Sequence, residues 1–133
     1  VTLQEKTDFG WEIHPRSLYD LLMRIKKDYP IEKIYITENG CAYNDPPNKN
    51  NIINDSKRIE YHSSHINELK NAIKDGVPCK GYFAWSLMDN FEWCEGFGKR
   101  FGLIWVDFES LERTPKQSFF WYKNLIENNG KES

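Results

Sequence analysis

Glu38 lies where a strand-forming run meets a turn, a place where enzymes often carry a catalytic carboxylate. It follows residues 34–37, Ile-Tyr-Ile-Thr, whose types favour a β-strand, and it precedes Asn39-Gly40, a strong chain-reversal signal. In parallel α/β sheets, active sites are built at the carboxyl ends of the strands. The stretch therefore predicts an active-site carboxylate at Glu38. A surface glutamate at the end of a strand is the alternative.

A second candidate site is the loop from Leu87 to Gly98, which mixes acidic and aromatic side chains. Its acids are Asp89, Glu92 and Glu95, and its large rings are Phe91, Trp93 and Phe97, with Trp85 just before it. A sugar presents apolar C–H faces to aromatic planes, and its hydroxyls bind carboxylates and indole N–H groups. The loop is therefore predicted to bind carbohydrate. A loop packed on its own aromatic rings is the alternative.

The histidines and cysteines give weaker signals. His62 and His65 are three residues apart in a predicted helix, but no third ligand is in view, so we interpret them as histidines near a helix surface. No metal or other cofactor is predicted. Cys41, Cys79 and Cys94 are odd in number and irregularly spaced, which predicts reduced thiols and favours a cytoplasmic protein.

The elements that must position these residues alternate between helix and strand. Apolar spacing predicts helices from about residue 14 to Pro30, over 56–74, and from Thr114-Pro115 to near residue 129. Strands are predicted over 34–37 and over 80–86, the second covered on both faces. Residues 100–108 are predicted to be extended and 109–113 to form a polar turn. This order predicts two adjacent parallel strands, each followed by a helix, within one structural unit over residues 1–133.

Length and charge exclude several classes of protein. The chain has 133 residues, enough for one domain but only about half of a barrel of eight βα units. Its 18 basic and 20 acidic residues give a net charge of −2, which argues against nucleic-acid binding and against a basic membrane-binding patch. No apolar run approaches the roughly 20 residues that span a bilayer, so no membrane partner is predicted.

Several of these stretches together resemble the family 1 glycoside hydrolases. Residues 36–40, Ile-Thr-Glu-Asn-Gly, resemble the motif around that family's nucleophile, and residues 81–93 resemble its sugar-binding motif. The similarity continues at residues 8–12, 99–103 and 113–116, and it covers about residues 7 to 127. The family uses a (β/α)8 barrel and hydrolyses β-glycosides with retention. The resemblance thus implies an α/β fold, the C-terminal portion of a TIM barrel with about strands 7 and 8 and their helices.

The resemblance also implies roles for individual residues. Glu38 would be the nucleophile, and Trp85 would line the −1 subsite. Glu92 would accept hydrogen bonds from the 4- and 6-hydroxyls, Trp93 would donate its indole N–H, and Phe101 would close the subsite near the exocyclic carbon. Phospho-sugar members of the family carry Ser where Glu92 stands and Tyr where Phe101 stands. The implied substrate is therefore a terminal β-D-glucoside or related β-hexoside without a phosphate.

One departure from the family pattern has consequences for activity. Retaining hydrolysis needs two carboxyl groups about 5–5.5 Å apart, and the family's acid/base Glu lies in an Asn-Glu-Pro motif that this sequence lacks. We therefore expect a C-terminal part of a larger enzyme, inactive without the missing N-terminal part of the barrel. A non-catalytic carbohydrate-binding module, or a structural half-barrel that pairs with a separate N-terminal fragment, are the alternatives.

Overall fold

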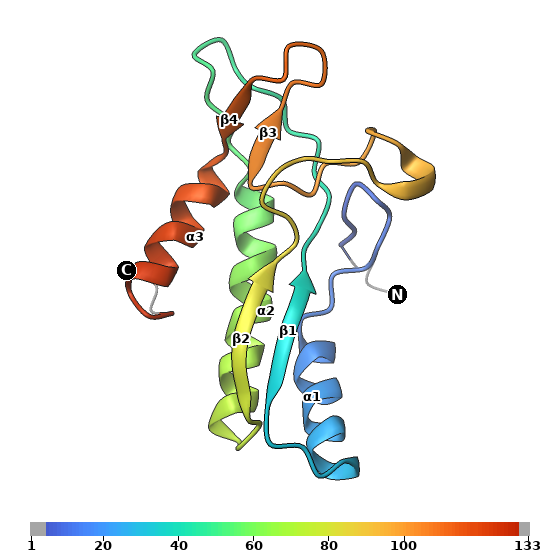
Figure 1. Ribbon diagram of the computed structural model, residues 1–133, viewed down its shortest axis with the longest axis vertical. Coiled ribbons are helices and arrows are strands. Elements are labelled where there is room, and N and C mark those ends of the chain that lie inside the picture. The colour runs from blue at the N-terminus through green and yellow to red at the C-terminus, as the bar shows by residue number, and fades with distance from the viewer. Residues whose placement is uncertain (1–4, 131–133) are drawn as a thin grey trace.

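Two parallel strands lie at the centre of the computed structural model, which describes residues 5–130 (Figure 1). Strand β1 (Ile34–Asn39) pairs with β2 (Cys79–Ala84), with Ile36 opposite Tyr82. Helix α2 (Ser56–Lys74) connects them. The prediction of adjacent parallel strands is confirmed, because sequential βα units place the second strand beside the first.

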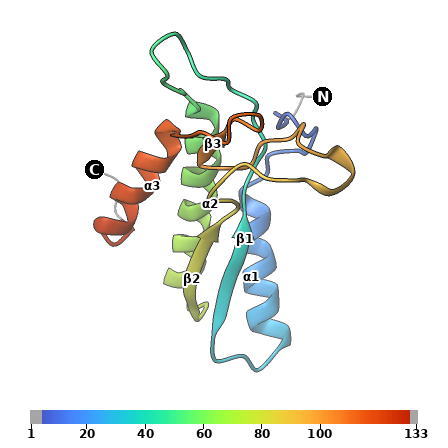
Figure 2. The ribbon, with the colours of Figure 1, turned by 45° about the horizontal axis from the view of Figure 1, so that its top comes forward.

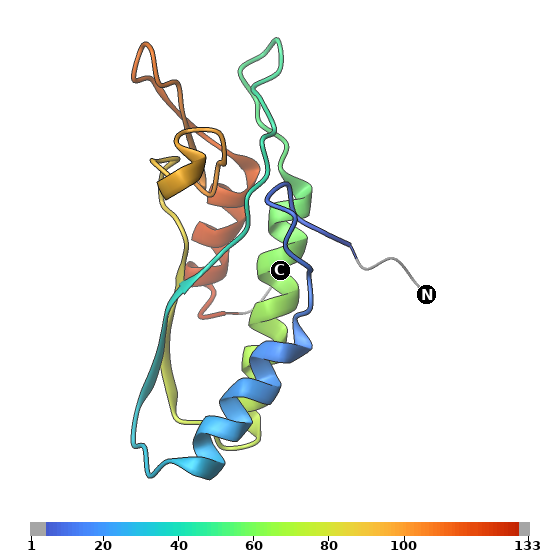
Figure 3. The same ribbon diagram turned by 90° about the vertical axis from the view of Figure 1, so that its right-hand side faces the viewer.

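The helices α1 (Arg16–Asp28) and α2 cover one face of this sheet, as Figure 3 shows. Four buried residues form the core between helices and sheet: Leu22, Leu69, Ala72 and Val77. Ile34, Ile36 and Tyr82 pack against it from the strands. The amphipathic spacing of the helices and the alternation of the strands bring these side chains to one layer.

The opposite face of the sheet is open, so the prediction of a second strand covered on both faces was wrong for the described chain. Tyr35 and Phe83 are 52% and 56% exposed. Both rings lie over Gly81, where a Cβ atom would come within 2.8 Å of the Tyr35 ring. The strand is apolar on both sides, but the described residues supply helices to only one of them.

The C-terminal third differs from the sequence prediction in detail. Only Ile104–Val106 of the predicted extended segment form a strand, β3, which pairs antiparallel with β4 (Arg113–Pro115). Thr114-Pro115 therefore does not cap a helix. The last helix, α3, spans Gln117–Glu127. The pairing of Trp105 with Thr114 explains the difference, since Pro is tolerated at the end of a strand as well as at the start of a helix.

The loops that follow β1 and β2 rise at the same end of the molecule (Figure 2). One is the long segment 40–55 before α2, and the other runs from residue 85 through the short 3-10 helix η1 (Trp93–Glu95). Both leave the carboxyl ends of their strands, which is where the sequence placed the site. Within residues 5–130, no helix is long and apolar enough to cross a membrane.

Candidate active site

A cavity of about 350 Å³ opens at the carboxyl ends of β1 and β2. Its lining includes all the site residues chosen from the sequence: Glu38, Trp85, Glu92, Trp93 and Phe101. Trp11, Asn39, Gly40, Asn90 and Phe91 complete it. The fold thus brings together residues from four separate stretches of sequence, at Trp11, 38–40, 85–93 and Phe101. Their chemical roles stay predictions.

The ends of the two strands are joined by their backbones beside Glu38. The Trp85 N–H donates to the Asn39 carbonyl oxygen at 2.7 Å. Gly40 lies against the same segment, and a Cβ atom there would sit 1.8 Å from the Trp85 carbonyl oxygen. The Asn39-Gly40 pair therefore does more than turn the chain, because only glycine permits this approach of the backbones. Glu38 itself is exposed to solvent at the cavity.

Two histidines lie beneath this strand end, and the expectation of histidines near a helix surface was wrong. His62 is fully buried, and His65 is 6% exposed. The inner face of α2 carries both, and the His62 Nδ1 atom lies 2.9 Å from the Tyr82 hydroxyl. Burial, helped by Arg58 and His65, lowers the pKa of His62 to about 3. Among residues 5–130 no group of three or more His, Cys, Asp or Glu side chains could hold a metal ion.

The aromatic loop is partly packed on itself and partly open. The Phe97 ring contacts Phe91 and Phe108, with centroid distances of 5.5 and 4.5 Å. Trp93 is different, since it is 82% exposed at the tip, where the Glu92 N–H donates to the Gly96 carbonyl oxygen. Phe101, on the far side of the cavity, is buried against Phe9 and Trp11. The self-packed alternative therefore describes one end of the loop, and the other end faces the cavity.

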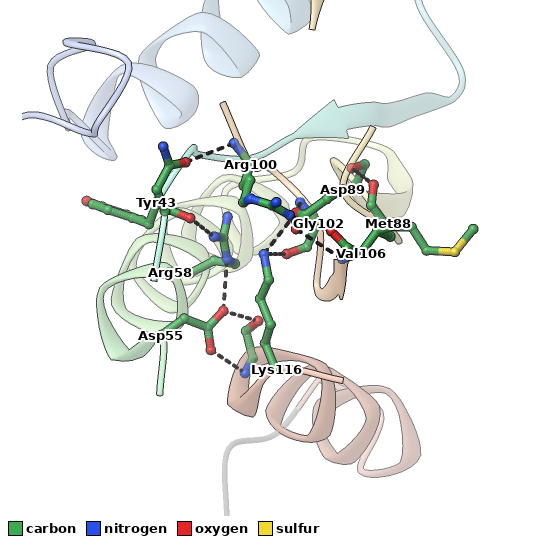
Figure 4. Close-up of polar contacts among 12 residues, drawn as sticks. Tyr43, Asp55, Arg58, Met88, Asp89, Arg100, Gly102, Val106 and Lys116 are labelled. Carbon is green, nitrogen blue, oxygen red and sulfur yellow. Dashed lines mark hydrogen bonds and ion pairs between the residues drawn. The ribbon is translucent and has the colours of Figure 1, made fainter. Parts of the chain in front are cut away.

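Asp89 connects this loop to the β3–β4 hairpin and its flanking residues through hydrogen bonds, a role that the sequence did not predict (Figure 4). Its carboxylate is buried and accepts four hydrogen bonds. The donors are Arg100 Nη1 at 2.7 Å, Lys116 Nζ at 2.9 Å, the Gly102 N–H at 2.9 Å and the Val106 N–H at 3.4 Å. Burial, with Arg58 as a second cause, lowers the pKa of Lys116 to about 8, although Asp89 opposes that change. Asp89 is thus occupied within the protein and is not free to bind a sugar.

A second buried ion pair, Arg58 with Asp55, holds the segment that follows Glu38 (Figure 4). The Arg58 guanidinium donates to Asp55 Oδ2 at 2.9 Å and to the carbonyl oxygens of Cys41 and Tyr43. Asp55 accepts two further bonds from the N–H and hydroxyl of Ser118. Asp55 occupies the N-cap position of α2, but its side chain makes no cap bond there, because it links α2 to α3 instead.

The cysteines are free thiols, as the sequence predicted. Cys41 is buried, Cys79 partly buried and Cys94 exposed. Burial raises the pKa of the Cys41 thiol to about 12, so it is protonated and inert at neutral pH. The cytoplasmic location stays a prediction.

The charges around the cavity are acidic. Among the described residues that line it, Glu38 and Glu92 are ionisable and none is a cation. The two nearest cations in sequence to Phe101 are engaged elsewhere, since Lys99 donates to the Asp8 carbonyl oxygen at 2.7 Å and Arg100 binds Asp89. This part of the site is therefore suited to hydroxyl groups and to a developing positive charge, and its described lining offers no positive charge to an anion.

Comparison with known proteins gives a consistent picture. Residues 2–131 match the family model described as Glycosyl hydrolase family 1. The 1,4-beta-D-glucan glucohydrolase of Thermotoga neapolitana is 49% identical over 125 residues, which cover 94% of this chain and 28% of that protein. The 6-phospho-beta-galactosidase of Staphylococcus aureus (strain JH9) is 52% identical over 124 residues, covering 92% of this chain and 26% of that protein.

Solved structures agree with these matches. The family 1 β-glucosidase from Thermotoga maritima superposes with a TM-score of 0.97 at 45% identity, covering 100% of this chain and 30% of that one. The same organism's β-glucosidase in complex with deoxynojirimycin gives a TM-score of 0.95 at 46% identity, covering 97% of this chain and 29% of that one. The chain spans less than a third of each of these relatives. The predicted fold, the C-terminal portion of a (β/α)8 TIM barrel, is confirmed.

Proposed function

Because this chain belongs to glycosyl hydrolase family 1, we propose that it forms the C-terminal part of an enzyme that hydrolyses terminal β-D-glucosides with retention. The observation that carries this proposal is the cavity in which Glu38, at a strand end, faces the aromatic and acidic loop that follows the next strand. The partner of the chain is the N-terminal part of the same barrel, which would cover the exposed sheet face at Tyr35 and Phe83.

The chemistry proceeds through two displacements. The Glu38 carboxylate attacks the anomeric carbon, the bond to the aglycone oxygen breaks, and a covalent glycosyl-enzyme forms through an oxocarbenium-like transition state. A second carboxyl group, supplied by the N-terminal part, protonates the leaving oxygen and then deprotonates the water that releases the sugar. The backbone bond between Asn39 and Trp85 holds the nucleophile in place before the sugar arrives, so little reorganisation is needed during the reaction.

The acidic lining favours a sugar without a phosphate group. A phosphate dianion beside Glu92 would be repelled, and no cation from the described lining would compensate that repulsion. The matched relatives include both glucosidases and a 6-phospho-beta-galactosidase, so specificity must come from particular residues and not from overall identity. We propose that Glu92 accepts hydrogen bonds from the 4- and 6-hydroxyls, that Trp93 donates its indole N–H, and that Trp85 and Phe101 form the walls of the −1 subsite.

The decisive test is Glu38→Ala in a complete barrel. This is either the protein's own barrel or one in which residues 5–130 replace the corresponding residues of the family 1 β-glucosidase from Thermotoga maritima. Turnover of an aryl β-glucoside should be abolished. Azide or formate should partly restore it by attacking the vacant face, with inverted product, since one displacement replaces two. Glu32→Ala, a glutamate at the opposite end of β1, is the matched control and should keep normal activity.

Several results would contradict the proposal. A Glu38→Ala enzyme of near-normal rate, or a rescued product of retained configuration, would show that Glu38 is not the nucleophile. Faster turnover of the 6-phosphoglucoside than of the glucoside would overturn the assignment of substrate. Residues 1–133 alone should show no glycosidase activity. Sugar binding without turnover by any complete form would instead support a non-catalytic carbohydrate-binding module.

A further inference from the structure

We propose that the buried His62 positions the nucleophile, acting on Glu38 through Tyr82 and Asn39. This inference rests on the proposed function for the reaction that it would affect. His62 lies on α2, Tyr82 on β2 and Asn39 at the end of β1. Their side chains form one line of hydrogen bonds, which we call the Asn39 anchor. His62 does not line the cavity, so it is a positioning residue and not a catalytic one.

The direction of the bonds follows from the donors available. The Tyr82 hydroxyl has a single proton, which it donates to Asn39 Oδ1 at 2.8 Å. Its oxygen can then only accept from His62, whose Nδ1 lies 2.9 Å away. His62 must therefore carry its proton on Nδ1. The Nε2 atom is then an unprotonated acceptor that is buried and has no hydrogen-bond partner among residues 5–130. A neutral imidazole in a single tautomer is what burial away from solvent favours, because a charged imidazolium would be costly there.

The anchor acts at a point where the sheet itself does not fix the strand. The register of β1 against β2 is irregular between Ile36 and Asn39, so the backbone ladder is interrupted at Glu38. Side chains alternate between the faces of a strand, and a slip of one residue exchanges them. Binding of the Asn39 side chain to Tyr82, on the helix side of the sheet, therefore turns the preceding Glu38 to the opposite side, toward the cavity. The Asn39 carbonyl oxygen also accepts a hydrogen bond from the Trp85 N–H, so Asn39 positions both Glu38 and Trp85 at the cavity.

The second buried histidine of α2 provides a matched control. His65 is similarly buried, but its Nδ1 donates to the Tyr61 carbonyl oxygen at 2.7 Å within the same helix. It also stacks on the Tyr61 ring at a centroid distance of 4.0 Å. Replacing His65 by Leu removes a buried imidazole and one hydrogen bond, as His62→Leu does, but it removes none of the bonds that join His62, Tyr82 and Asn39. Asn39 Nδ2 also donates to the Tyr61 hydroxyl at the longer distance of 3.5 Å, so Tyr61→Phe is measured beside His65→Leu to show how much of any change comes through Tyr61. A general effect of losing a buried histidine would appear in both variants.

The kinetic test uses the complete barrel and an aryl β-glucoside. We expect His62→Leu to lower kcat by about 3- to 10-fold, with KM within twofold of wild type, because one neutral hydrogen bond that orients the nucleophile is lost. His62→Asn, which keeps an N–H donor near the position of Nδ1, should recover part of that loss. Tyr82→Phe removes the bond to Asn39 itself, so it should lower kcat at least as much as His62→Leu does. The double variant should be no worse than Tyr82→Phe, since both changes act through one anchor. Equal losses of kcat in His62→Leu and His65→Leu, or additive losses in the double variant, would overturn the proposal.

A measurement without substrate keeps this inference distinct from the proposed function. Hydrogen exchange of the Trp85 amide reports its bond to Asn39 directly. The exchange should become several-fold faster in His62→Leu and Tyr82→Phe, and it should be unchanged in His65→Leu. If the wild-type barrel hydrolyses no glycoside, the proposed function fails, but this exchange still decides whether the anchor exists. If His62→Leu does not fold, Tyr82→Phe, which removes a single oxygen, decides it alone. Unchanged Trp85 exchange in Tyr82→Phe would refute the anchor.

Discussion

Glu38 and Glu92 line the same cavity, yet the segments that carry them are stabilised by different interactions. Glu38 ends a strand whose inner residues pack on an apolar core around Leu22 and Leu69. Glu92 lies in a loop none of whose described residues belongs to that core, and the loop is attached through the buried charges of Asp89 and Lys116. Apolar packing is non-directional and roughly proportional to buried area, whereas an ion pair depends on each partner. A single substitution of a buried charge should therefore displace the loop and the residues that it carries, whereas truncation of one core residue should leave the position of Glu38 nearly unchanged.

The sharpest test of this contrast compares Asp89→Ala with Leu22→Ala in the complete barrel. Removing Asp89 leaves the buried Lys116 without its carboxylate, which should cost about 3–5 kcal/mol of unfolding free energy. Leu22→Ala should cost a comparable amount, about 2–5 kcal/mol, through transfer and cavity formation. Urea denaturation measures both. The difference should appear in KM, which we expect to rise for Asp89→Ala and to stay near wild type for Leu22→Ala.

Glu95→Gln is the control for Asp89→Ala, because Glu95 is an exposed acid of the same loop. It should change the unfolding free energy by less than about 0.5 kcal/mol. If Asp89→Ala unfolds like Glu95→Gln, the loop does not depend on its buried charges and the contrast is wrong. An equal rise of KM in Leu22→Ala and Asp89→Ala would also contradict the proposed contrast between the strand and the loop.

A second test concerns the cavity side of the loop, where the charge of Glu92 should serve binding and not stability. Glu92 is only partly buried, and no ion pair of the described residues includes it. Glu92→Gln should raise the barrier for a glucoside by about 1–3 kcal/mol, the range for a charge-assisted hydrogen bond, with almost no change in unfolding free energy. The loss should be largest for substrates with intact 4- and 6-hydroxyls. Equal losses for the parent and deoxy sugars would remove Glu92 from the subsite.

The same contrast explains how much the sequence could predict. The β1–β2 pair, its helices and the position of Glu38 follow from periodicity and turn signals within short windows. The cavity residues could be chosen because strand-end position and residue type both mark them. The roles of Asp89, Arg58 and Lys116 could not be found that way, because each depends on partners far along the chain, such as Asp55 with Ser118. A buried charge looks like a surface charge in sequence until its partner is placed.

The open sheet face shows the same limit from another side. Apolar residues on both sides of 80–86 indicated a strand, and a strand was found over Cys79–Ala84. These apolar residues could not indicate that the described chain covers only one face of the strand with helices, because coverage depends on which other elements are present. The β3–β4 hairpin was missed for a local reason, because Thr114-Pro115 fits a helix start as well as a strand end.

The last expected effect is a pH dependence of stability that arises from the histidine buried beneath the strand end. Burial lowers the folded-state pKa of His62 to about 3, below its ordinary value of 6.5. The unfolded chain therefore binds the proton more tightly, and stability is lost as the pH falls below about 6.5. The loss of unfolding free energy should be about 0.7 kcal/mol between pH 7 and pH 6, and about 1.4 kcal/mol for each further pH unit down to the folded-state pKa.

Urea denaturation of the complete barrel from pH 7 to pH 5 measures this loss. His62→Leu is the comparison, since that variant should lack this part of the pH dependence. The difference between the two curves is the part of the pH dependence that requires His62. Parallel curves would show that solvent reaches His62, and the region beneath the strand end would then be less buried than the structure indicates.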